Sequence, residues 1–98
     1  MREQRRTQRY NLRLPLELVK KGAQEVSLSG ETRNLSSGGV LFSPPDVMNV
    51  GDPIKYVITL PTSERAGRKV ELHCTGKVVR TQNDSVAVTL ERYEFIRL

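Results

Sequence analysis

Strict alternation of leucine with other residues is the feature that most constrains this chain. Residues 11–18 read Asn-Leu-Arg-Leu-Pro-Leu-Glu-Leu, so leucine occupies every even position from Leu12 to Leu18. A period of two predicts a half-buried β-strand, with the leucines together on its core face. Pro15 belongs to the opposite face and lacks an N–H group, which predicts either an edge strand or a bulge at this place.

Further runs with the composition of short strands follow, and turn residues separate them. The predicted strands cover about 26–35, 40–42, 54–60, 69–80 and 85–90. Glycine, proline, asparagine and aspartate cluster between the runs, most clearly at Ser43-Pro44-Pro45-Asp46 and at Gln82-Asn83-Asp84. Gly30, inside the second run, is a candidate bulge.

Six short strands with little helical signal predict an all-β fold, a small six-stranded antiparallel barrel. Closure removes the exposed edges that such short strands would otherwise present. Residues 91–98 fit neither period, and we expect either a short helix or a strand extension there. The expected organisation is therefore a flexible arginine-rich arm over 1–9 and a single barrel domain over 10–98.

Composition excludes several classes of function. One cysteine, Cys74, and one histidine, His73, are too few for a structural zinc site, which takes four ligands. No spacing pairs His73 with an orienting group and a nucleophile, so we expect neither metal nor catalysis. Cys74 lies in an alternating run and is expected to be buried. No apolar run approaches the ~18 residues that cross a bilayer and no signal peptide is visible, so we expect a cytoplasmic protein.

The N-terminus concentrates positive charge. The net charge is +5, and residues 1–13 hold five arginines against one acid, Glu3. Arginine suits bidentate recognition of phosphate, and its guanidinium also pairs with the O6/N7 edge of guanine and stacks on bases. Arg5 and Arg9, with Arg6 between them, lie at most roughly 13–14 Å apart along an extended backbone. They can clamp a compact ligand with two anionic groups; a solvated basic tail is the alternative.

A second unusual stretch, Asn34-Leu35-Ser36-Ser37-Gly38-Gly39, joins the second and third predicted strands. Its small polar residues and glycines favour a tight turn, accept φ > 0 and let another group approach the backbone closely. Taken alone, the stretch is more typical of a strand-to-strand turn than of a site.

Together the two stretches resemble the PilZ domain family. Arg5-Arg6-Thr7-Gln8-Arg9 matches the Arg-x-x-x-Arg motif of PilZ domains, and Asn34–Gly39 matches their second motif, Asp/Asn-x-Ser-x-x-Gly. The interval between the motifs, the six-stranded barrel and the run Gly76-Lys77-Val78-Val79-Arg80 are also similar to PilZ domains. The resemblance covers essentially the whole chain.

This resemblance implies a bacterial receptor for the second messenger cyclic di-GMP. The arginines of the arm would contact phosphate and guanine, and the second motif would contact another part of the ligand from the barrel surface. Gln4 stands where many relatives carry a further arginine, a position that influences whether one ligand or a stacked pair binds. The implied ligand-binding residues are Arg5, Arg6, Arg9, Asn34, Ser36 and Gly39.

Ordering of the arm is the expected mechanism of signalling. Without ligand the arm is expected to stay mobile, and binding would fix it over the barrel at roughly 1–2 kcal/mol per ordered residue. The surface made by arm and ligand would then recruit a protein partner. Two alternatives stay open: a basic barrel that binds nucleic acid, and a PilZ-fold interaction module that does not bind nucleotide.

Overall fold

The computed structural model describes residues 10–44, 47–61 and 69–97. The predicted arm over 1–9 lies outside these ranges, so the division into arm and barrel stays a prediction. Every regular element within the described ranges is a strand: β1 (Pro15–Lys21), β2 (Gln24–Leu35), β3 (Gly39–Ser43), β4 (Pro53–Leu60), β5 (Val70–Thr81), β6 (Val86–Thr89) and β7 (Arg92–Arg97).

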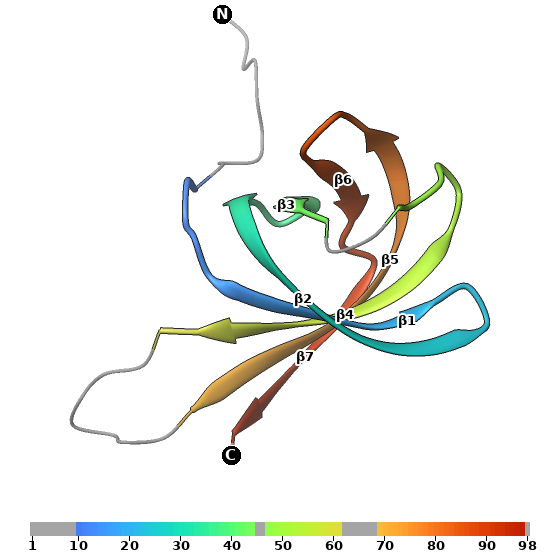
Figure 1. Ribbon diagram of the computed structural model, residues 1–98. Coiled ribbons are helices and arrows are strands. Elements are labelled where there is room, and N and C mark those ends of the chain that lie inside the picture. Colours follow the sequence, from blue (N-terminus) through green and yellow to red (C-terminus); the bar gives the residue numbers. More distant parts are fainter. Residues whose placement is uncertain (1–9, 45–46, 62–68, 98) are drawn as a thin grey trace, which may run out of the picture.

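Six of these strands close into an antiparallel barrel (Figure 1). Neighbours pair in the order β4-β1-β2-β3-β6-β5, and β4 also pairs with β5, which completes the ring. The all-β fold and the six-stranded barrel predicted from the periodicity are therefore confirmed. Closure pairs both edges along most of the ring, whereas the first part of β2, from Gln24 to Gly30, pairs only with β1.

β7 is an additional strand outside the ring (Figure 1). It lies along Val70–Thr75 of β5, whereas β6 pairs with β5 farther along, from Val78 to Thr81. One long strand thus belongs to the barrel and also carries the extension. Of the two alternatives for the C-terminal residues, the structure shows the strand extension.

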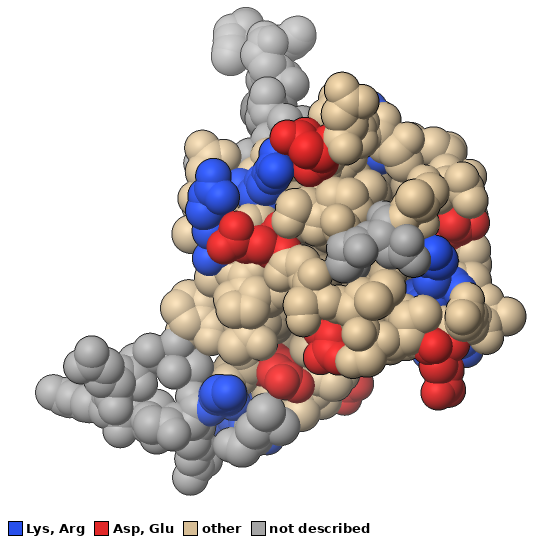
Figure 2. All heavy atoms as spheres, in the orientation of Figure 1, with Lys and Arg blue, Asp and Glu red and all other residues tan. Residues whose placement is uncertain are grey.

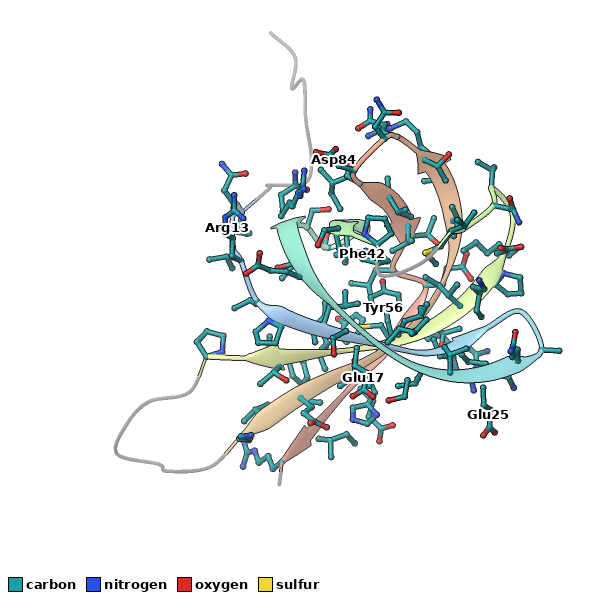
Figure 3. All side chains as sticks on the ribbon, viewed as in Figure 1. Arg13, Glu17, Glu25, Phe42, Tyr56 and Asp84 are labelled. Atoms are coloured by element: carbon teal, nitrogen blue, oxygen red, sulfur yellow. The ribbon has the colours of Figure 1, made fainter. Side chains whose placement is uncertain are left out.

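Aliphatic side chains fill the barrel around two stacked aromatic rings. Phe42 and Tyr56 are fully buried, and their ring centroids lie 6.3 Å apart (Figure 3). Cys74 is buried, as predicted, and burial raises the pKa of its thiol to about 12. The thiol therefore stays protonated at neutral pH, which makes it an inert part of the core rather than a nucleophile.

The predicted start of the first strand is wrong. β1 begins at Pro15 rather than at residue 11, and Leu12 is 41 % exposed instead of joining the core leucines. The cause is Thr32: its Oγ1 accepts a 2.8 Å hydrogen bond from the Leu14 N–H and donates a 2.6 Å bond to the Leu12 carbonyl. The backbone here bonds to a side chain instead of continuing a regular ladder.

The expectation of an edge strand or a bulge at Pro15 is also wrong. β1 pairs with both β2 and β4, and its register shift falls between Leu18 and Lys20. Pro15 is tolerated because it is the first residue of the strand, before the pairing with β4 begins at Leu16. Gly30 pairs regularly with Leu16, so the predicted bulge at Gly30 is absent as well.

The described ranges contain neither a candidate membrane-spanning helix nor a candidate metal site. No helix there is long and apolar enough to cross a membrane. Nor do the side chains described in these ranges include a group of three or more histidine, cysteine, aspartate or glutamate residues able to hold a metal ion.

Candidate ligand-binding site

A β-bulge near the end of β2 turns Asn34 to the outside of the barrel. Thr32 pairs with Phe42 and Asn34 pairs with Leu41, which leaves Arg33 as an extra residue. Thr32 is fully buried and Leu35 packs against the core, so simple alternation would have put Asn34 inside with Thr32. The extra residue keeps Asn34 on the outer face, as bulges beside functional sites often do.

A second bulge in β5 does the same for Arg80. Val78 pairs with Val88 and Arg80 pairs with Ala87, which leaves Val79 as the extra residue. Val78 is buried in the core, whereas Val79 is half-exposed and Arg80 is exposed. The two bulges flank the same pair of strands, β3 and β6.

Between the bulges a row of four residues crosses the outer face of the barrel: Asn34 on β2, Leu41 on β3, Ala87 on β6 and Arg80 on β5. Strands lie about 4.8 Å apart, so the two polar ends of the row are separated by roughly 14 Å at the backbone. These residues line a shallow hollow of about 270 Å³, with Ser36, Gly39 and Thr89 also on its border. We call it the outer hollow.

The turn from Ser36 to Gly39 forms one end of the outer hollow. The Ser36 N–H donates to the Gly39 carbonyl at 2.9 Å, and the Ser36 hydroxyl also donates to that carbonyl at 3.2 Å. The same hydroxyl oxygen accepts a bond from the Gly38 N–H at 3.3 Å. Ser36 therefore holds the turn through its side chain as well as its backbone.

Gly39 is required by crowding rather than by backbone conformation. A Cβ at this position would lie 2.8 Å from the Val88 carbonyl oxygen on β6, closer than real Cβ contacts allow. Among the described residues positive φ is confined to Gly22 and Gly51, so this turn does not use the φ > 0 that its glycines could accept. The expected close approach is present, between β3 and β6.

The chain that follows Arg9 is fixed beside this turn. The Tyr10 N–H donates to the Leu35 carbonyl at 2.9 Å, and the Leu35 N–H donates to the Tyr10 carbonyl at 2.9 Å. This two-bond bridge joins Tyr10 to the residue between Asn34 and Ser36. The polypeptide therefore leaves the arginine-rich segment directly at the border of the outer hollow.

Comparison with family models decides the identity of this barrel: the PilZ domain model matches residues 3–96. The chain belongs to the PilZ domain family. PilZ domains are generally associated with cyclic di-GMP binding, and they are typically binding or regulatory modules rather than enzymes. A search of curated proteins finds no match to this chain.

The stretch that resembles the second PilZ motif borders the outer hollow. Asn34, Ser36 and Gly39, singled out from the sequence, all border the hollow. Arg5, Arg6 and Arg9 lie outside the described residues, so their positions stay predictions.

Arg80 also lines the outer hollow, at the end opposite Asn34, although the candidate residues taken from the sequence do not include it. The available signal was the pair of adjacent valines before it, because Val78-Val79 interrupts an otherwise regular alternation.

Charge around the outer hollow of this PilZ domain is uneven. Arg33 pairs with Asp84 at 3.5 Å, which neutralises one arginine near the β5–β6 turn. Arg80 makes no ion pair with any residue that the structure describes, so its charge stays available at the hollow. Elsewhere, Figure 2 shows basic and acidic side chains interspersed on the face in view rather than a continuous basic surface.

His73 has a partner that the sequence did not suggest. Its Nε2 lies 3.0 Å from Glu71 Oε1 on the outer face of β5. Cys74 belongs to the opposite, buried face of that strand. The pair is a surface contact between neighbours on one face of a strand, two residues apart.

Proposed function

We propose that this PilZ domain is a bacterial, cytoplasmic receptor that binds cyclic di-GMP between the outer hollow and the N-terminal arm. Arg5 and Arg9, with Arg6 between them, supply the guanidinium groups for the ligand's phosphates. The observation that carries the proposal is the Tyr10–Leu35 bridge, which starts the arm beside Asn34 and Ser36. The two motifs are separated by 24 residues of sequence. Tyr10, the residue that follows the first motif, is nevertheless hydrogen-bonded to Leu35, inside the second.

The chemistry of the hollow suits a ligand with both phosphate and purine parts. The Asn34 carboxamide supplies a donor and an acceptor for a base edge, and it has no hydrogen-bond partner among the described residues. Leu41 and Ala87 give an apolar floor between the polar ends. Arg80 adds an unpaired guanidinium at the far end, suited to phosphate or to the O6/N7 edge of guanine.

Ser36 has a narrower role than the family motif implies. Its hydroxyl hydrogen is engaged with the Gly39 carbonyl, so the hydroxyl can accept from a ligand without disturbing the turn. Its main contribution is to hold the turn that carries Asn34 and Gly39. Ordering of the arm over bound ligand then presents a new surface to a protein partner, which is the proposed output.

Isothermal titration with cyclic di-GMP tests this function. Loss of charge-assisted hydrogen bonds, worth about 1.5–3 kcal/mol each, should lower the affinity of Arg5→Ala and Arg9→Ala at least tenfold. Arg80→Ala should lose less affinity, because it removes only one of the two polar ends of the outer hollow and leaves the arm intact. Arg92→Ala is the matched control: it removes an equal charge from exposed β7 and should bind as the wild type does.

Three results would overturn the proposal. The first is no heat of binding with folded wild-type protein, which would favour a PilZ-fold interaction module without nucleotide. Equal affinities for Arg9→Ala and Arg92→Ala would be the second. The third is tight binding of an oligonucleotide that excess cyclic di-GMP does not displace, which would favour a nucleic-acid-binding barrel. Melting temperatures of the free variants should match the wild type within about 2 °C.

A further inference from the structure

β7 has one free edge and an uncovered face. Its pairing with Val70–Thr75 uses one edge, and no described strand pairs with the other. A free edge presents a row of backbone N–H and C=O groups, which is a template for another extended chain. β7 runs out of the barrel along β5 (Figure 1), and within the described ranges no further strand continues the sheet beyond it.

The uncovered face carries aromatic side chains. Tyr93 pairs with buried Cys74 and Phe95 pairs with buried Leu72, so both aromatics share the core face of β5. Tyr93 is nevertheless 58 % exposed and Phe95 is 61 % exposed. Their rings meet edge to face, with centroids 5.9 Å apart. Two neighbouring aromatic rings open to solvent on a strand edge are typical of an interaction surface rather than of a finished core.

These rings form part of an apolar groove of about 230 Å³, which extends from β7 to Leu72 of β5. We call it the aromatic groove; its apolar lining residues are Tyr10, Leu35, Leu72, Leu90, Tyr93 and Phe95. Ser36 and Ser37 form its polar border. The groove therefore lies on the other side of the same turn that borders the outer hollow, and it is a separate surface.

The segments that the structure does not describe are poor occupants of this groove by composition. Residues 1–9 contain one apolar side chain, Met1, and residues 62–68 contain one, Ala66. The other undescribed positions, 45, 46 and 98, are too few to form an added strand. A second copy is also a poor occupant, because β7 has six residues and spans only about 20 Å. Stable protein dimers bury about 1,600 Å² in total, more than one short strand pairing supplies. A short extended peptide from another protein matches both the length and the groove.

The charge at the end of the strand specifies the peptide further. Arg97 follows Tyr93 and Phe95 on the same face of β7, since side chains alternate along a strand. It is exposed, and it makes no ion pair with the described part of the chain. An acidic residue on an added strand, two positions from an apolar anchor, would meet this guanidinium across the strands.

We propose that the free edge of β7 and the aromatic groove bind an extended peptide segment of a partner protein by strand addition. The peptide runs antiparallel to β7. On the face toward the groove it carries an acidic residue opposite Arg97, then apolar residues opposite Phe95 and Tyr93. This surface does not depend on cyclic di-GMP binding, so the two proposals fail independently.

A defined probe tests the proposal: acetyl-Thr-Asp-Thr-Leu-Thr-Phe-Thr-amide, titrated into the full chain by isothermal calorimetry or NMR. Phe95→Ser should weaken binding at least tenfold, since it removes the centre of the groove. Arg97→Glu should weaken binding of this probe and strengthen binding of the same peptide with Lys in place of Asp. Val50→Ser, which removes an exposed apolar side chain in the loop before β4, is the control and should bind as the wild type does.

Backbone pairing is tested separately with two N-methylated probes, each methylated at alternate amides. One set of amides faces β7 and the other faces solvent, so one probe should lose binding and the other should keep it. Equal loss from both, or no binding of the parent probe to folded wild-type protein, overturns the proposal. So does a concentration-dependent dimer that Phe95→Ser abolishes, because the groove would then be occupied by a second copy.

Discussion

Thr32 ties the segment before β1 to the barrel through its side chain. It is fully buried, yet both its hydrogen-bonding functions are used: the hydroxyl accepts from the Leu14 N–H and donates to the Leu12 carbonyl. The Thr32 N–H also donates to the Leu14 carbonyl at 2.9 Å. Farther toward the N-terminus, the Tyr10–Leu35 bridge continues the attachment. The two hydrogen bonds of this hydroxyl thus replace backbone ladder bonds in the segment before β1.

Thr32→Val should therefore destabilise the domain although it preserves volume. The variant leaves the buried Leu14 N–H without an acceptor, and an unsatisfied buried group costs about 1–3 kcal/mol. Urea unfolding should show this loss in the free energy of unfolding. Thr81→Val, a matched change at the exposed end of β5, should shift it by less than about 0.5 kcal/mol. Equal shifts for the two variants would mean that the Thr32 hydroxyl is not needed.

At the scale of strands, the alternation of apolar residues predicts which segments pair and which faces are buried. The run from Val70 to Val78 is an example. Its apolar residues gain free energy by leaving water whichever strand lies next to them, so the alternation alone predicts the buried face. Alternation fails where a side chain or an extra residue replaces a ladder bond. Before β1, the Thr32 hydroxyl takes the place of ladder bonds, so the alternating leucines at 12 and 14 are not part of a strand. The bulges at Arg33 and Val79 depend on how β2 and β5 pair with β3 and β6, which lie elsewhere in the sequence.

The residues of the candidate site could be predicted from the sequence about as far as the strands could. Asn34, Ser36 and Gly39 were singled out by their match to the second PilZ motif, because asparagine, serine and glycine alone are ordinary turn residues between two strands. Arg80 was not, because an arginine near a strand end is common and its place opposite Asn34 follows from pairing with β6. The aromatic residues of β7 were not recognised as a surface, because residues 91–98 fit neither period and the sequence left open whether they form a helix or a strand.

The contact between β3 and β6 should be sensitive to one methyl group at Gly39 and insensitive to one at Gly38. A Cβ at Gly39 would meet the Val88 carbonyl, whereas a Cβ at Gly38 would meet nothing within 4 Å. We expect Gly39→Ala to lower the free energy of unfolding by about 1–3 kcal/mol, because the strands must move apart.

Gly38→Ala should be neutral or slightly stabilising, by up to about 1 kcal/mol, since it restricts the unfolded chain. Chemical denaturation of both variants checks the pair, and hydrogen exchange at Leu90, whose N–H donates to the Gly38 carbonyl, reports the local effect. Equal stability of the two variants would contradict the crowding at Gly39.

At the scale of the whole molecule, the outer hollow and the aromatic groove share a border. Ser36 borders both the outer hollow and the aromatic groove, and Tyr10 lines the groove at the point where the arm begins. If cyclic di-GMP orders the arm, it also restrains Tyr10 and hence one side of the groove. When one ligand has already ordered this region, the second ligand does not have to supply the conformational entropy of ordering it. The two sites should therefore bind cooperatively.

This coupling rests on the proposed function and predicts a reciprocal effect. Saturating cyclic di-GMP should tighten binding of the Asp-containing probe about fivefold or more, and saturating probe should tighten cyclic di-GMP by the same factor. Paired calorimetric titrations measure both factors, and Arg9→Ala should remove the effect of nucleotide on the probe. If cyclic di-GMP binds and the probe affinity is unchanged, the coupling is wrong, whereas the two binding sites are not contradicted.

The two bulges also determine where this sequence can change in length. Arg33 and Val79 are single-residue insertions relative to regular pairing, so deleting either would leave every other residue of its strand on its present face. A deletion elsewhere in β2 or β5 would exchange inner and outer faces for all residues beyond it. Gaps placed at Arg33 and Val79 in an alignment therefore keep Asn34 and Arg80 matched to their counterparts in shorter relatives.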